Sequence, residues 1–160
     1  MKYYLMAAEQ GHAEAQNSVG SGLQAEKRYS EARIWYERSS AQENAVATNN
    51  LAYLYDLGLG VPQDRKKGFE LYTKSAELGW PEAMWNLANI YGAGQIDKPD
   101  IMQACIWVSR AGRFAGDNHS NLSVLASRAM LRLQKVLTED QFTKCNLESS
   151  LWTPGLTPIN

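Results

Sequence analysis

The strongest constraint on the fold of this chain is a sequence pattern that returns after 36 residues. Five positions keep the same residue at this offset: Ala47, Leu51, Ala52, Tyr55 and Gly58 are followed by Ala83, Leu87, Ala88, Tyr91 and Gly94. A weaker copy, Ala15, Val19, Gly20 and Leu23, stands 32 residues before the first of these sets. Self-similarity at such a period is typical of arrays of stacked structural units.

Each unit reads as two helices joined by a loop. Leu51 and Tyr55 are four residues apart and share one helix face. Gly58 then suits a left-handed cap, and Asp64 can accept backbone N–H bonds where the second helix begins. That second helix carries Tyr72 on its apolar stripe. No stretch alternates as a strand would, so the pattern predicts an all-α fold of about nine helices.

The unit boundaries follow from the offsets. We expect a half repeat over residues 1–11, repeats over about 12–44, 45–80 and 81–116, two capping helices over 117–153, and a tail over 154–160. Because residues 3–11 match residues 71–79, the chain is expected to begin inside a repeat. The lack of a signal peptide therefore says nothing about the compartment.

Composition narrows the class of partner. The chain has 160 residues, 44% of them apolar, and a formal net charge of -1 from 16 basic and 17 acidic residues. This balance argues against a dedicated binder of nucleic acid or anionic membranes. No apolar run approaches the ~20 residues that span a bilayer. We expect a protein or peptide partner, no nucleic acid and no membrane insertion; the monomer is favoured, and end-to-end self-association stays open.

The string from Leu51 to Asp64 resembles the loop of the Sel-1-like repeat, a relative of the tetratricopeptide repeat. The resemblance covers roughly residues 1–116 and is typical of bacterial proteins. It implies a right-handed α-α superhelical solenoid of antiparallel helix pairs, with a concave groove lined by the first helix of each pair. Family members act as adaptors, mostly without catalysis of their own. The repeat at 12–44 lacks the loop glycines, and the third repeat has Gly94-Gln95-Ile96 where Gly-Val is expected.

Catalytic and metal-binding signals are weak. His12 and His119 precede predicted helices with no ligand cluster around them, which favours a surface or capping role. No serine has a lysine three residues later, as a penicillin-recognising site would need. We therefore predict no enzyme activity, no cofactor and no metal. The alternative is a small hydrolase acting on cell-wall or β-lactam substrates.

The two cysteines, Cys105 and Cys145, do not have zinc-ligand spacing. The simpler interpretation is two buried thiols. The other is a disulfide that joins a repeat helix to the C-terminal helix.

The candidate binding face lies away from the core stripe of each first helix. Asn49 and Tyr53 are two residues before and after Leu51, so they are rotated roughly 200° from it. With their equivalents in the flanking units, the predicted groove residues are Asn17, Ser21, Asn49, Tyr53, Trp85 and Asn89. None of them is Lys or Glu, the usual choices for a solvated face. Amides can bind a peptide backbone and aromatic rings can anchor it. The alternative is that the curvature of the solenoid merely crowds this face.

Overall fold

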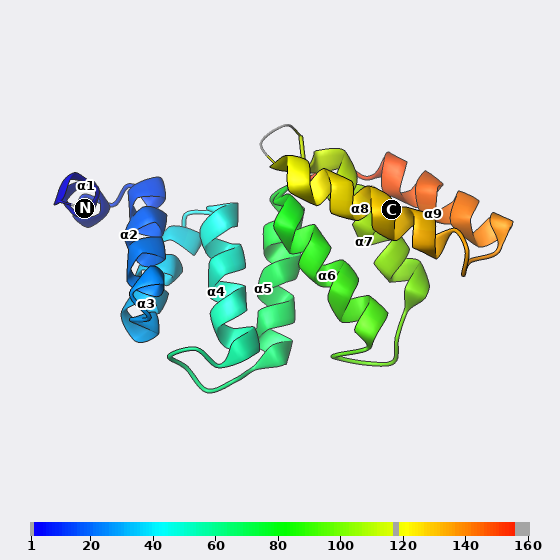
Figure 1. The fold of residues 1–160 in the computed structure, drawn as a ribbon. Helices are drawn as coiled ribbons and strands as arrows, with labels where there is room; N and C mark the ends of the chain where they lie inside the picture. The colour runs from blue at the N-terminus through cyan, green and yellow to red at the C-terminus, as the bar shows by residue number, and fades with distance from the viewer. Residues whose placement is uncertain (1, 117–118, 156–160) are drawn as a thin grey trace. The chain divides into compact units, whose positions relative to one another are not determined.

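The computed structural model describes residues 2–116 and 119–155 (Figure 1). Within these ranges the chain forms nine helices and no strand: α1 (Lys2–Glu9), α2 (Ala13–Ala25), α3 (Tyr29–Ser40), α4 (Ala45–Leu57), α5 (Arg65–Glu77), α6 (Pro81–Ala93), α7 (Ile101–Phe114), α8 (Ser120–Leu133) and α9 (Glu139–Leu151). The all-α prediction is confirmed. Residues 117–118 of the predicted capping segment and 156–160 of the predicted tail lie outside the described residues.

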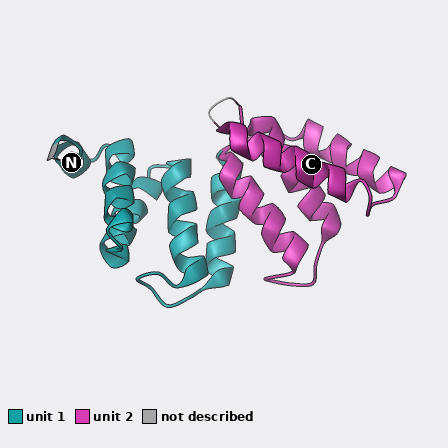
Figure 2. Cartoon of the chain, viewed as in Figure 1, with its two compact units in different colours: residues 1–78 teal, residues 79–160 magenta. Residues whose placement is uncertain are grey.

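The helices group into two compact units (Figure 2). The first covers residues 1–78 and contains α1 to α5; the second covers residues 79–160 and contains α6 to α9. In the first unit the buried core gathers small and apolar side chains of α1 to α4, including Ala8, Val19, Tyr36 and Leu51.

In the first unit, α3 packs against both α2 and α4, and α5 packs against α4. One buried hydrogen bond recurs in both complete pairs. The Ser39 hydroxyl donates to the carbonyl of Ala13 at 2.7 Å, and the Ser75 hydroxyl donates to the carbonyl of Ala45 at 2.7 Å. Both serines are fully buried. The bond therefore ties the end of each second helix to the start of its first helix.

We expect Ser75→Ala to lower the free energy of unfolding by about 1 kcal/mol, the usual net value of a buried hydrogen bond. The matched control is Ser18→Ala, because the Ser18 hydroxyl is exposed and bonds only within its own helix, to the carbonyl of Glu14. Urea unfolding followed by circular dichroism measures both. If both variants leave the free energy of unfolding nearly unchanged, the Ser75 hydrogen bond does not stabilise the packing of α5 on α4.

The local signals at the helix ends are confirmed. Gly58 adopts the left-handed conformation, with φ of 70°, and caps α4. The Asp64 side chain accepts from the backbone N–H of Lys67 at 2.9 Å and caps α5. In addition, Thr138 and Gln141 form a capping box at the start of α9.

The two histidines precede helices as predicted, but neither side chain makes a cap hydrogen bond. The His119 ring is instead held from three sides: Nδ1 is 2.9 Å from the carbonyl of Ala115, Nε2 is 3.1 Å from a carboxylate oxygen of Glu82, and the ring packs edge-on against Trp80. Of the expected surface or capping role, a cap on α8 is wrong for His119, because its ring bonds instead to the carbonyl of Ala115, the residue that follows α7, and to Glu82.

The loop after α4 explains the second glycine of the repeat string. Gly60 has φ of +68°, and a Cβ built there would lie 2.5 Å from the backbone N of Ser30 and 2.7 Å from the carbonyl carbon of Tyr29. The Ser30 hydroxyl donates to the Gly60 carbonyl at 3.1 Å. The loop of one repeat thus rests on the first turn of the preceding second helix, which only glycine permits.

In the second unit, α6, α8 and α9 all pack against α7. Cys105 of α7 and Cys145 of α9 form a disulfide, with Cα atoms 6.1 Å apart. This corrects the expectation of two free thiols: the fold brings two residues 40 positions apart within bonding distance, which their spacing in the sequence does not reveal. Met102, Met130 and Phe142 pack around the bond.

The far end of α9 is held on α7 by aromatic rings. Trp152 packs edge-on against Trp107 and Phe114, at centroid distances of 5.9 and 5.6 Å. The Arg110 guanidinium lies 4.7 Å from the ring centroids of both Trp107 and Trp152. Desolvation by burial, with help from nearby Arg113, lowers the pKa of Arg110 to about 10. Arg113 also donates to the carbonyls of Ser150 and Trp152.

Candidate functional site

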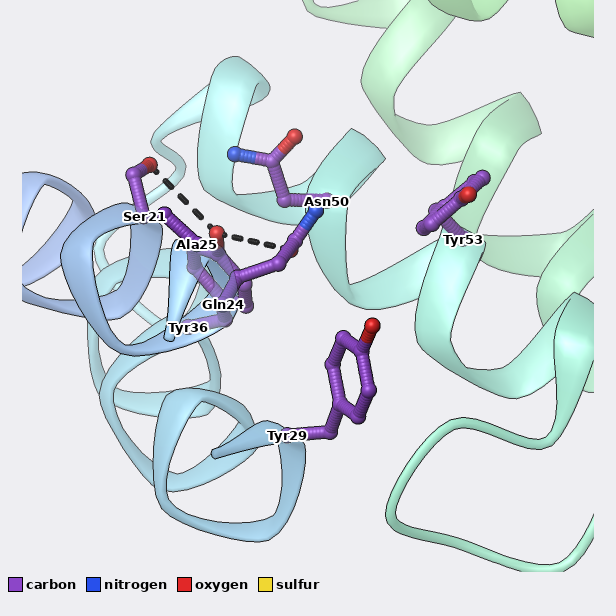
Figure 3. Close-up of a pocket in the computed structure, with 7 residues that line it drawn as sticks. All are labelled: Ser21, Gln24, Ala25, Tyr29, Tyr36, Asn50 and Tyr53. Carbon is purple, nitrogen blue, oxygen red and sulfur yellow. Dashed lines mark hydrogen bonds between the residues drawn. The ribbon is translucent and has the colours of Figure 1, made fainter. Parts of the chain in front are cut away.

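A small open pocket lies where α2, α3 and α4 meet in the first unit (Figure 3). Its volume is about 290 Å³. Apart from Ala25, the lining residues are polar or aromatic: Ser21, Gln24, Tyr29, Tyr36, Asn50 and Tyr53. None of them carries a charge at neutral pH, so the pocket is suited to neutral groups.

Tyr36 forms the inner part of the pocket and is 1% exposed. Its ring occupies the space that Gly20 leaves on α2, since a Cβ at Gly20 would lie 2.6 Å from the ring. The Tyr36 hydroxyl donates to the Gln24 side-chain oxygen at 2.9 Å and lies 3.4 Å from the Ser21 hydroxyl (Figure 3). Burial raises the pKa of Tyr36, against the lowering effect of the Ser21 bond. The hydroxyl therefore keeps its proton at neutral pH and fixes the Gln24 amide.

The outer part of the pocket is made by two more tyrosines. Tyr29 extends from the first turn of α3, which the Gly60 loop supports, and Tyr53 extends from α4 (Figure 3). Tyr53 is 40% exposed. Asn50, also on α4, donates to the Asn17 side-chain oxygen on α2 at 3.2 Å, which links the two first helices.

Only some of the predicted groove residues lie at the pocket. Ser21 and Tyr53 line the pocket, and Asn17 is next to it through its bond with Asn50. Asn49 is half-buried on α4. Trp85, half-buried, and Asn89, exposed, lie on α6 in the second unit.

Four lining residues with hydrogen-bonding side chains were not predicted: Gln24, Tyr29, Tyr36 and Asn50. The sequence pattern assigns Tyr36 to the core stripe of its helix, which is right for the ring but overlooks the hydroxyl. One signal was available. The weaker first repeat has glycine at position 20 where the others have alanine, and this marks a place for a large partner.

Neither metal nor membrane features are found in the described part of the chain. Within residues 2–116 and 119–155 no three His, Cys, Asp or Glu side chains form a group that could hold a metal ion. In the same ranges no helix is long and apolar enough to cross a membrane.

Comparison with known proteins places these repeats in a family. The Sel1 repeat model matches residues 1–12, 13–44, 45–80 and 81–113. An uncharacterized protein of Neisseria meningitidis serogroup B is 37% identical over 101 residues, which are 63% of this chain and 21% of the relative. The chain therefore spans about a fifth of the length of that curated relative.

Two solved structures share the fold. A protective antigen of uropathogenic Escherichia coli strains, described as displaying an SLR fold, superposes with a TM-score of 0.79 at 26% identity, covering 92% of this chain and 31% of the antigen. A Sel1 repeat protein from Oxalobacter formigenes gives a TM-score of 0.63 at 18% identity, covering 88% of this chain and 73% of that protein. The predicted fold class, an α-α solenoid of helix pairs, is confirmed.

Proposed function

Because this chain belongs to the Sel1 repeat family, whose repeats typically mediate protein interactions, we propose that it is a non-catalytic scaffold that binds a segment of a partner protein. In the first unit the proposed binding face is that of the first helices α2 and α4, and it centres on the pocket between α2, α3 and α4. The observation that carries the proposal is the make-up of this pocket, which combines side-chain amides with partly exposed tyrosine rings.

The chemistry of the pocket favours a peptide. Gln24 and Asn50 offer amide groups that can pair with a peptide backbone, and Tyr29 and Tyr53 offer ring faces for an apolar or proline side chain. The volume of about 290 Å³ suits one side chain and its flanking backbone better than a cofactor. Since no lining residue is charged, the segment that enters is neutral at this point.

The remaining predicted residues extend the proposed contact. Asn17 and Asn49 belong to the same two first helices as the pocket, so they would contact the peptide beyond it. Trp85 and Asn89 hold the equivalent positions on α6 and would provide a second contact region. No observation on the described residues favours the small hydrolase, so it is not proposed.

The first test uses a library of random 12-residue peptides displayed on phage, selected on the intact chain. Tyr53→Ala should weaken selected peptides at least tenfold, the size expected when a central aromatic anchor is removed. The matched control is Ile34→Ala, because Ile34 is 43% exposed and Tyr53 is 40% exposed, but Ile34 does not line the pocket. Fluorescence anisotropy measures the affinities.

The double variant Asn49→Ala with Trp85→Ala tests the two proposed contact regions, one in each unit. Its folding is checked first by circular dichroism. If selected peptides bind this variant and Tyr53→Ala as tightly as the intact chain, the first-helix face is not the binding site, and the loops or the opposite face become the place to search.

A further inference from the structure

The side chain of Gln24 is held in one orientation by the tyrosine behind it. Tyr36 is 1% exposed, so the proton of its hydroxyl needs an acceptor within the protein. The Gln24 side-chain oxygen, at 2.9 Å, is closer than the Ser21 hydroxyl, at 3.4 Å. In Figure 3 the amide nitrogen of Gln24 points away from the Tyr36 hydroxyl. Gln24 therefore offers its NH₂ group, a donor, to the pocket that it lines.

Asn50, on α4, has the opposite arrangement. Its amide nitrogen donates to the Asn17 side-chain oxygen on α2 at 3.2 Å. This bond fixes which end of the Asn50 amide is directed at α2. The Asn50 side-chain oxygen has two lone pairs and remains the end of the amide that can accept a hydrogen bond from a ligand. The same pocket is thus lined by one oriented donor, on Gln24, and one oriented acceptor, on Asn50.

This pair of groups is selective among the polar ends of side chains. A carboxylate has acceptors alone, so its oxygen would face the Asn50 oxygen without a proton between them. An ammonium group has donors alone and cannot bond to the NH₂ group of Gln24. Both ions would also enter without a counter-charge, since no lining residue is charged. A carboxamide is neutral and has one acceptor oxygen and one donor nitrogen, which match the pocket.

We propose, on the basis of the function proposed above, that this pocket receives the primary carboxamide of a glutamine or asparagine side chain of the partner peptide. The carboxamide oxygen accepts from Gln24, and its NH₂ group donates to Asn50. The rings of Tyr29 and Tyr53 contact the methylene groups of the same side chain (Figure 3). A primary carboxamide stands at the free end of a side chain and can reach the inner part of the pocket, whereas a backbone amide has chain on both sides.

The probes are three five-residue peptides, acetyl-Ala-Ala-X-Ala-Ala-N-methylamide, in which X is glutamine, glutamate or alanine. Their blocked ends add neither charge nor a primary carboxamide. Glutamate has the shape of glutamine, and alanine keeps only the backbone. Nuclear magnetic resonance titration of the intact chain detects even millimolar affinities. We expect the glutamine peptide to shift the side-chain NH₂ signals of Gln24 saturably, and the other two peptides to bind at least tenfold more weakly.

Gln24→Glu should reverse the preference of the pocket. The substitution replaces the NH₂ group by an oxygen, while the Tyr36 hydroxyl keeps an acceptor, so the local packing is retained. We expect the glutamine peptide to lose at least tenfold in affinity. A fourth peptide, with lysine at X, should bind this variant more tightly than the parent chain. Circular dichroism checks the fold. If glutamine and lysine peptides keep the same order of affinity in both proteins, Gln24 does not contact the ligand and the proposal is wrong.

Tyr36 is a positioning residue in this proposal, because its hydroxyl bonds to Gln24 and not to the ligand. Tyr36→Phe keeps the ring in the space left by Gly20 and removes only the hydroxyl. The Gln24 amide can then turn either end to the ligand. The ratio of glutamine to glutamate affinity should fall roughly two- to tenfold, the effect of one hydrogen bond. A merely structural role would weaken both peptides and leave this ratio unchanged.

The outcomes separate carboxamide recognition from the function on which it rests. If the glutamine and glutamate peptides bind equally and Tyr53→Ala weakens both, the pocket binds peptides without reading a carboxamide, and only the present proposal is wrong. If the alanine peptide binds as tightly as the glutamine peptide, the backbone occupies the pocket, with the same consequence. If no peptide shifts the signals of the pocket, carboxamide recognition is overturned, and the phage-selected peptides decide the proposed function by themselves.

Discussion

Gly60→Ala is expected to lower the free energy of unfolding by about 2–5 kcal/mol and to disturb the first turn of α3. Two effects add. The left-handed conformation, with φ of +68°, costs a residue with a Cβ about 1–2 kcal/mol. The Cβ would also approach the backbone of Tyr29 and Ser30 to 2.7 and 2.5 Å, and backbone cannot rotate aside, which adds about 1–3 kcal/mol.

The control separates the two effects. Gly116 has φ of +53°, and a Cβ there would have no atom of the described residues within 4 Å, its chain neighbours aside. Gly116→Ala therefore reports conformational strain alone, and urea unfolding compares the two variants. If both lose the same stability, the loop is not held by close approach, and glycine at position 60 serves only the turn.

The same substitution has a functional consequence under the proposed function. Tyr29 lines the pocket from the turn that the Gly60 loop supports. Shifting this turn moves the ring, so peptides selected on the intact chain should bind Gly60→Ala less tightly. Gly116→Ala should leave their affinity unchanged. If Gly60→Ala and Gly116→Ala both bind the selected peptides as tightly as the intact chain does, Tyr29 does not contact the peptide.

Loss of the disulfide is expected to destabilise the second unit by about 4 kcal/mol. The bond closes a loop with a sequence separation of 40, and the chain-entropy model gives this value for a loop of that length. Without it, α9 keeps its hold on α7 mainly through Trp152, which packs against Trp107 and stacks with Arg110. Hydrogen exchange should therefore rise first in the half of α9 around Cys145.

Two forms of the protein measure this loss. Cys105→Ala with Cys145→Ala removes the bond but also deletes two buried sulfur atoms, so part of its effect is a packing defect. Reducing the wild-type chain with dithiothreitol keeps both sulfur atoms and isolates the cross-link. The melting temperature should fall on reduction in the wild type and stay constant in the double variant. An unchanged wild-type melting temperature would show that the bond does not stabilise the fold.

Helix positions and helix ends could be predicted from the sequence because they are set by neighbouring residues. The spacing of Leu51 and Tyr55 reflects the period of the helix itself, and Gly58 and Asp64 act within one turn. The repeat strengthened the prediction of the helices, because the same residues recur 36 positions later in the chain. The partners of His119 could not be predicted: the expectation was a surface or capping role, and the ring does not cap α8 but pairs with Glu82, which lies far away in sequence.

The sequence alone determined the helix-pair architecture and the Sel1 repeat character of this protein, whereas the tertiary structure decided which side chains meet. The pairing of Cys105 with Cys145 depends on how α9 packs on α7, and the pocket depends on the fit of Tyr36 into the notch at Gly20. Periodicity tells which face of a helix is apolar. It does not tell how closely two helices approach, and that distance determines whether a tyrosine hydroxyl reaches Gln24 or two sulfur atoms come into bonding range.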